Sequence, residues 1–207
     1  MIRVEDRGAV RQITMARAEK ANALTREMLE ALEGAVAGAQ DARVLILTGE
    51  GRVFSAGADL EAARAGLAVD PVWDRLSSQI AAFSGLSIAA LNGTVAGGGI
   101  GMALACDLRV AVAGAEVFYP VMKLGFLPQP ADPARLIALV GPARAAMILM
   151  AGHRLGSDEA LAWGLFDRIV PPGEQVTASE ALAAAVLAAQ PGHGAAIKAM
   201  LRRTDLG

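Results

Sequence analysis

The chain has 207 residues, of which 54% are hydrophobic and 19% are charged, so it can bury one sizeable core and is not a disordered protein. Its formal net charge of −2 provides no basic surface for nucleic acid, and no apolar run is long enough to cross a membrane. A single cysteine, Cys106, permits no internal disulfide, and with two histidines the chain is poorly equipped for a metal site. We therefore expect a soluble cytoplasmic protein that acts on a small molecule without a metal.

In chain order, the hydrophobic pattern predicts strands that alternate with helices. Strands are expected at 2–5 and 9–15, joined by a turn at 6–8, and then at 44–48, 53–55, 87–92, 108–113, 116–118 and 166–170. Helices are expected after Thr25, which would be an N-cap, and at 72–84, 100–105, 133–140, 142–150, 158–163, 174–190 and 195–203. Ser157 would be the N-cap of the helix at 158–163, and residues 119–130 are expected to form a loop. This order indicates an α/β fold in one domain, residues 1–207, with an α/β core at 1–172 and a helical segment at 173–207.

Three consecutive glycines, residues 97–99, lie between a predicted strand and a predicted apolar helix. Glycine lets the backbone come within hydrogen-bonding distance of a ligand, and free N–H groups at the start of a helix attract negative charge. The spacing matches neither the dinucleotide fingerprint nor a Walker motif. A tight turn, a pyrophosphate site and a site for a thioester or carbonyl oxygen that gains negative charge are therefore the open interpretations.

A second glycine motif, taken together with the first, resembles the crotonase family of enoyl-CoA hydratases and isomerases. The two motifs are 54–60, Phe-Ser-Ala-Gly-Ala-Asp-Leu, and 92–99, Asn-Gly-Thr-Val-Ala-Gly-Gly-Gly. Supporting matches at 19–24, 45–49, 106–107 and 158–165 extend the resemblance along nearly the whole chain. The resemblance implies repeated ββα units arranged in a spiral. It also implies that the C-terminal helices are shortened, so that the lid of the acyl pocket is missing or supplied by a neighbouring subunit.

The resemblance further implies a site for an acyl-CoA thioester. In the family, each glycine turn presents one backbone N–H to the thioester oxygen, which by position means Ala58 and Gly98. Coenzyme A is then part of the substrate and not a separate cofactor. The residues expected to bind the substrate are Lys20, Ala21, Asn22 and Ala56 along the coenzyme A groove, Asp59 beside the first turn, where it also holds its own turn, and Val121 in the acyl pocket. The family also implies a homotrimer or a hexamer.

The chain departs from the family where the catalytic carboxylates belong. Gly101 and Val121 stand where the hydratases carry two glutamates, and neither residue can transfer a proton. Asp132 is a candidate acid or base, although an aspartate before a proline is more simply a helix N-cap. Tyr119 is a candidate proton donor, although an aromatic residue there is more simply part of the core. The amide Gln129 stands where some dienoyl-CoA isomerases place an acid.

Three functions are consistent with this sequence. The first is an acyl-CoA enzyme with a nonstandard catalytic set, which catalyses isomerisation, hydrolysis or decarboxylation. The second is an acyl-CoA-binding protein that has lost proton transfer, and the third is a structural protein that uses neither. The enzyme is preferred because both glycine turns are intact, although the same glycines also allow helix and sheet to pack.

Overall fold

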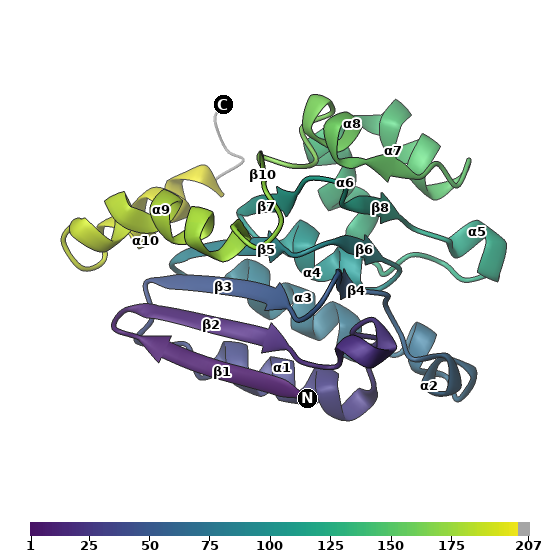
Figure 1. Ribbon diagram of the computed structural model, residues 1–207, viewed down its shortest axis with the longest axis horizontal. Coiled ribbons are helices and arrows are strands. Elements are labelled where there is room, and N and C mark those ends of the chain that lie inside the picture. Colours follow the sequence, from purple (N-terminus) through teal and green to yellow (C-terminus); the bar gives the residue numbers. More distant parts are fainter. Residues whose placement is uncertain (203–207) are drawn as a thin grey trace.

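Two β-sheets and the helices around them make up residues 1–202, which are the residues that the structure, a computed structural model, describes (Figure 1). Within these residues the larger sheet has six strands in the order β1 (Ile2–Arg7), β2 (Val10–Met15), β3 (Val44–Gly49), β5 (Leu86–Leu91), β7 (Leu108–Val112) and β10 (Arg168–Val170). β1 pairs with β2 in antiparallel fashion, and the other pairs are parallel. The smaller sheet contains β4 (Val53–Ser55), β6 (Thr94–Ala96), β8 (Glu116–Phe118) and the antiparallel strand β9 (Leu155–Gly156).

One order of elements recurs along the chain. β3, β5 and β7 of the larger sheet are each followed within a few residues by a short strand of the smaller sheet and then by helices. These helices are α2 (Leu60–Arg64) and α3 (Val72–Ala82) in the first unit, α4 (Gly99–Ala105) in the second, and α5 (Val121–Leu124) and α6 (Asp132–Val140) in the third. The recurrence confirms the predicted ββα units.

The turns that follow the short strands lie side by side. β4 pairs with β6, and β6 pairs with β8, in parallel, so the carboxyl ends of these strands meet at one edge of the smaller sheet. Residues 56–59 follow β4, residues 97–98 follow β6, and residues 119–120 follow β8. This edge therefore brings together both glycine motifs and the region of Tyr119.

Apolar side chains on both faces of the larger sheet form the core. Figure 1 shows α1 (Arg26–Ala37), α3 and α4 behind this sheet and α9 (Gln175–Ala188) in front of it. As a result all six residues of β3 are buried, which is typical of a strand covered on both faces. Thr25 caps α1 as predicted, because its side chain accepts a hydrogen bond from the backbone N–H of Met28 at 3.4 Å.

Several local predictions are wrong. The first hairpin turns at residues 8–9 and not at 6–8, because β1 continues to Arg7, which pairs with Val10. The predicted loop 119–130 contains the short helix α5. Ser157 is the first residue of α8 (Ser157–Ala162) and not its cap, and its hydroxyl accepts a hydrogen bond from the N–H of Gly114. The 3₁₀ helices η1 (Ala18–Lys20) and η2 (Leu67–Val69) were not predicted.

The later helices follow the sequence pattern closely. They are α7 (Pro142–Leu149), α9 and α10 (His193–Leu201), and α9 packs on β3, β5 and β7. The last residue of the predicted helix 195–203, and the end of the predicted segment 173–207, lie outside the described residues.

Cys106 is buried, and burial raises the pKa of its thiol to about 12, so it packs as an uncharged core residue. None of the helices within residues 1–202 is both long enough and apolar enough to span a membrane. The same residues hold no cluster of three or more His, Cys, Asp or Glu side chains placed to bind a metal ion.

Two buried asparagines clamp the turn between β3 and β4. Asn92 accepts a hydrogen bond from the N–H of Gly49 at 2.9 Å and donates to the carbonyls of Gly51 and Val53 at 3.0 and 3.1 Å. Asn22 donates to the carbonyls of Glu50 and Val53 at 2.9 and 2.7 Å. The turn sets the path of β4, and β4 leads directly into the first glycine motif. The two amides therefore position that motif through the backbone.

Replacing Asn92 with alanine should lower the free energy of unfolding by about 3 kcal/mol, because it leaves buried backbone donors and acceptors unpaired. Urea denaturation measures this loss. The matched control is Ser78→Ala on the exposed side of α3, which should change the free energy by less than about 0.5 kcal/mol. Equal stabilities for the two variants would contradict the clamp.

Candidate active site

The edge formed by the ends of β4, β6 and β8 borders an open cavity of about 140 Å³. Its walls are mostly apolar. They are formed by Ala56, Ala58, Leu60, Ala63, Ala68, Trp73, Gly97, Gly98, Tyr119, Pro120, Val121, Leu124, Phe126, Leu127 and Gln129. A concave, largely apolar site with a few convergent polar groups is the usual form of a small-molecule pocket.

Two turns that touch each other, one containing Ala58 and the other Gly98, lie beside this cavity. Gly57 has a φ of +90°, and a Cβ placed on it would lie 3.1 Å from both the nitrogen of Gly98 and the carbonyl oxygen of Ala96, so only glycine fits. Ala58 and Gly98 both line the cavity. Within residues 1–202, neither the N–H of Ala58 nor that of Gly98 donates a hydrogen bond. The two turns therefore leave two N–H groups beside the cavity without an acceptor in this part of the chain.

The first turn is held by side chains that bond to its backbone. The hydroxyl of Ser55 accepts from the N–H of Gly57 at 3.1 Å. Asp59 caps α2 by accepting from the N–H of Glu61 at 3.1 Å, and it pairs with Arg17 at 2.9 Å. The Arg17 guanidinium holds the pKa of the Asp59 carboxyl below its usual value. Asp59 thus holds its own turn, as expected.

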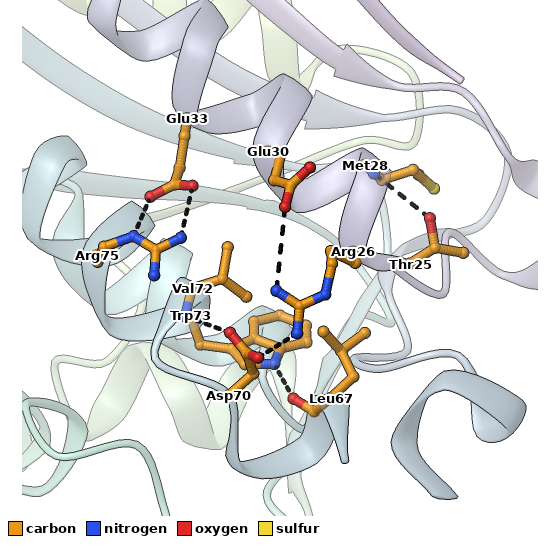
Figure 2. Close-up of polar contacts among 10 residues, drawn as sticks. All are labelled: Thr25, Arg26, Met28, Glu30, Glu33, Leu67, Asp70, Val72, Trp73 and Arg75. Atoms are coloured by element: carbon orange, nitrogen blue, oxygen red, sulfur yellow. Dashed lines mark hydrogen bonds and ion pairs between the residues drawn. The ribbon is translucent and has the colours of Figure 1, made fainter. Parts of the chain in front are cut away.

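Trp73 forms the wall behind the second turn. A Cβ on Gly98 would lie 2.8 Å from the Trp73 ring, so the indole packs directly on this glycine. The indole nitrogen donates to the carbonyl oxygen of Leu67 at 2.8 Å, as Figure 2 shows. Trp73 is 3% exposed, so the bond satisfies a buried donor and fixes the ring against the cavity.

The segment that carries Trp73 is anchored to α1. Figure 2 shows the Asp70 carboxylate between the guanidinium of Arg26 and the backbone N–H of Val72, which donates to it at 2.9 Å. Arg75, one turn into α3, pairs with Glu33 of α1 at 3.0 Å. These contacts join the beginning of α3 to α1 and so hold the wall in place.

Tyr119 and Asp132 form a buried pair next to the cavity. The Tyr119 hydroxyl donates to Asp132 Oδ2 at 2.9 Å and accepts from the backbone N–H of Gln129 at 3.2 Å. The predicted N-cap role of Asp132 is wrong. Ala131 occupies the cap position, and the side chain of Asp132 makes no cap hydrogen bond but turns inward, where it is 1% exposed.

The carboxylate of Asp132 lies where a side chain on residue 101 would extend. A Cβ on Gly101 would be 2.9 Å from Asp132 Oδ1 and 3.1 Å from Oδ2. Gly101 is one turn along α4 from Gly98, and residues three apart share a helix face. The carboxylate therefore packs on the same face of α4 as the second glycine turn.

Comparison with known proteins agrees with this geometry. The family profile described as enoyl-CoA hydratase/isomerase matches residues 5–205. The chain belongs to this family. It is 34% identical to the carnitinyl-CoA dehydratase of Salmonella arizonae over 98% of this chain and 80% of the relative. Its fold matches the solved structure of Pseudomonas aeruginosa DspI with a TM-score of 0.89 and 33% sequence identity, over 97% of this chain and 79% of the other. It also matches the structure of Bacillus anthracis enoyl-CoA hydratase with a TM-score of 0.89 and 29% identity, over 97% of this chain and 81% of the other.

Membership of the enoyl-CoA hydratase/isomerase family confirms the resemblance and the crotonase-like fold that the motifs predicted. The other predicted site residues are distributed unevenly around the cavity. Ala56 and Val121 line it. Lys20 is exposed at the end of η1. Ala21 is half-buried, and its carbonyl oxygen accepts a hydrogen bond from the N–H of Ala56 at 3.0 Å.

The side chain of Asn22 is fully buried and bonded to backbone, so any contact of residues 20–22 with coenzyme A would have to come from the others or from backbone. Their role in binding stays a prediction.

One wall of the cavity was missed in the sequence. Leu60, Ala63 and Ala68 come from α2 and η2, and the side-chain amide of Gln129 donates to the carbonyl oxygen of Ala68 at 3.1 Å. This bond links the segment before α3 to the loop after α5. The exposed apolar residue Leu60 at the start of a polar helix was the available signal, since such a side chain has no core to enter.

The environment of the buried pair shifts both of its proton equilibria. Burial raises the pKa of the Asp132 carboxyl to about 6, and the nearby charge of Asp74 adds to this, while the Tyr119 hydrogen bond and Arg135 act in the opposite direction. Burial and the carboxylate also raise the pKa of Tyr119. At neutral pH the phenol is therefore protonated, whereas the Asp132 carboxyl gains or loses its proton near pH 6.

Asp132 should make the stability of this protein depend on pH. Its folded-state pKa of about 6 exceeds that of the unfolded chain, so the folded state binds more protons between these values. Stability should fall as the pH rises from about 4 to about 6, by about 3 kcal/mol, and stay lower above that range. Asp132→Asn keeps an acceptor for Tyr119 and should lack this fall. Urea denaturation of both proteins across this range measures the difference, and parallel curves would contradict it.

Gly101→Ala should lower the free energy of unfolding by about 1–3 kcal/mol, because the new methyl group meets the buried Asp132 carboxylate. Gly34→Ala is the matched control, since Gly34 lies within α1 and a Cβ there meets nothing within 4 Å. That variant should gain about 0.5–1 kcal/mol. In an Asp132→Ala background the cost of Gly101→Ala should shrink by at least about 1 kcal/mol. Additive costs would show that the two side chains do not share one volume.

Proposed function

We propose that this protein is an acyl-CoA enzyme that holds a thioester oxygen between the N–H groups of Ala58 and Gly98 and stabilises the enolate formed there. The observation that carries the proposal is the pair of touching turns whose N–H groups have no acceptor within residues 1–202 and line one apolar cavity. Family membership supports the substrate class, because enzymes of this family act on acyl-CoA thioesters.

The chemistry of a thioester explains why two such donors matter. When the carbon next to the thioester loses a proton, the electron pair moves onto the thioester oxygen as negative charge. A donor already aimed at that oxygen lowers the barrier by roughly 3–4 kcal/mol, since it needs no reorganisation when the charge appears. The apolar walls supply a place for the acyl chain.

The reaction differs from ordinary hydration. Gly101 and Val121 cannot activate water or protonate carbon, although the family's hydratases use glutamates at these positions. Isomerisation, hydrolysis and decarboxylation of an acyl-CoA can all use the same pair of N–H donors. The carnitinyl-CoA dehydratase relative, whose name gives a CoA thioester as its substrate, supports the substrate class.

A catalytically inactive acyl-CoA-binding protein is the alternative, and the loss of both glutamates favours it. Both functions are compatible with a homotrimer or hexamer in the cytoplasm. The oligomeric state and the location stay predictions. The apolar side chains exposed on α7 and α10, including Met147, Ile197 and Met200, are where contacts between subunits would be expected.

The proposal predicts that acetyl-CoA, butyryl-CoA and crotonyl-CoA bind and that butyryl-CoA binds roughly tenfold more tightly than acetyl-CoA, because two more methylene groups are buried. Calorimetric titration measures the affinities, and mass spectrometry of the same mixtures detects any product. Trp73 lines the cavity and Trp163 does not, so emission from Trp163→Phe protein should respond to the ligand, whereas emission from Trp73→Phe protein should not.

Product formation would establish an enzyme, and the product mass would distinguish water addition from hydrolysis of the thioester. Binding without any product from these substrates would favour the inactive binding protein. Absence of binding would overturn the proposal and leave only family membership and the fold.

A further inference from the structure

We propose that Tyr119 and Asp132 are the proton-transfer groups of this site, with the Tyr119 hydroxyl touching the substrate and Asp132 acting through it as a positioning residue. This inference rests on the proposed function, because it supplies the proton transfer that an enolate requires. It assigns the transfer to residues outside the two positions at which the family carries glutamates.

The first argument is the position of the pair. Tyr119 lines the same cavity as Ala58 and Gly98, and its side chain is otherwise enclosed, with 4% exposed. Its hydroxyl has one donor, the N–H of Gln129 at 3.2 Å, and one acceptor, Asp132 Oδ2 at 2.9 Å. The two bonds fix the phenol oxygen between a rigid backbone amide and a carboxylate. This oxygen therefore links a residue that lines the cavity to the buried carboxylate.

The second argument is that a purely structural carboxylate would be better satisfied. Asp132 is 1% exposed, and within residues 1–202 its Oδ1 has no hydrogen-bond partner. The nearest cation, Arg135, is 3.9 Å from Oδ1 and donates instead to the hydroxyl of Ser77 at 2.8 Å. A buried carboxylate with one free oxygen destabilises a folded protein, and such local conflicts concentrate at functional sites.

The third argument is the shared volume with Gly101. The carboxylate fills the space into which a side chain on residue 101 would extend, on the face of α4 that carries Gly98. Asp132 thus brings a carboxylate from α6 to the region beside the second glycine turn. Because Gly101 has no side chain, there is room for the Asp132 carboxylate at this place.

The proton transfer is balanced as follows. The C–H bond next to the thioester breaks, and its proton goes to the Tyr119 oxygen while the Tyr119 proton moves to Asp132 Oδ2. The electron pair moves onto the thioester oxygen, which Ala58 and Gly98 hold. Asp132 becomes neutral as the enolate becomes negative, so charge is conserved. In the reverse direction Tyr119 returns a proton to carbon and takes one back from Asp132.

The pair predicts a specific dependence on pH. Asp132 must be ionised to accept the proton, so the rate should rise with pH through the pKa of this carboxyl, about 6. The charged and titratable groups around it are Tyr119, Arg135 on α6 and Asp74 on α3. This increase of the rate with pH is called the rising limb of the pH profile. Asp74→Asn removes a like charge near Asp132, so it should move the rising limb to lower pH without abolishing it.

The test is exchange of the protons beside the thioester of butyryl-CoA in deuterated water, followed by nuclear magnetic resonance. This readout needs only enolate formation, whatever reaction follows. Tyr119→Phe and Asp132→Asn should each slow exchange by at least about 100-fold with dissociation constants within about threefold of the parent protein. Asp132→Asn should also lose the rising limb, whereas Asp74→Asn, the matched carboxylate control, should keep the maximal rate.

The outcomes separate this inference from the proposed function. Parent protein that fails to bind butyryl-CoA overturns the proposed function. Binding without exchange, or exchange at the parental rate in folded Tyr119→Phe protein, overturns the assignment of the pair and leaves acyl-CoA binding intact. Thermal melts show which variants fold, and if Asp132→Asn does not fold, Tyr119→Phe and the pH limb of the parent protein still decide the outcome.

Discussion

The site depends on how closely two backbone turns approach each other. A Cβ on Gly57 would lie 3.1 Å from the nitrogen of Gly98, and the turns can touch because β4 and β6 are parallel neighbours whose carboxyl ends meet. Around this contact the backbone is held by amide and hydroxyl side chains, Asn92 and Ser55 among them. Two N–H donors are thereby fixed before any ligand arrives. Such preorganisation is what makes a donor effective on a charge that develops only during a reaction.

The same closeness explains the unusual position of the carboxylate. Gly101 of α4 has no side chain, so the helix leaves room there for a side chain from another element. Asp132 fills that room from the first turn of α6, and Tyr119 holds one of its oxygens. The chain accepts a poorly satisfied buried carboxylate there, although an apolar residue of similar size would stabilise the fold more. Its stability is lowered at the place where the proposed chemistry needs a proton acceptor.

Local sequence patterns predicted what depends on neighbouring residues in the chain. Both glycine turns, the cap at Thr25 and the buried strand β3 belong to this class, because a motif, a side-chain cap and an apolar run are each encoded within a few positions. Asp132 was misread for the same reason. An aspartate before a proline has the local signature of a cap, whereas its actual orientation is set by Gly101, 31 positions earlier, and by Tyr119. The wall formed by α2 and η2 also depends on a distant contact, between Gln129 and Ala68.

The proposed relay through Tyr119 and Asp132 is a single route for a proton, and a single route restricts the reactions that this geometry can support. Water addition needs one group to activate water and another to protonate carbon, and Val121 provides neither. A single relay that removes a proton and returns it from the same side suits a reaction in which the proton leaves one carbon and is delivered to another. If Tyr119 and Asp132 transfer the proton, shifting the double bond of an enoyl-CoA is therefore the reaction that requires the fewest groups beyond those present.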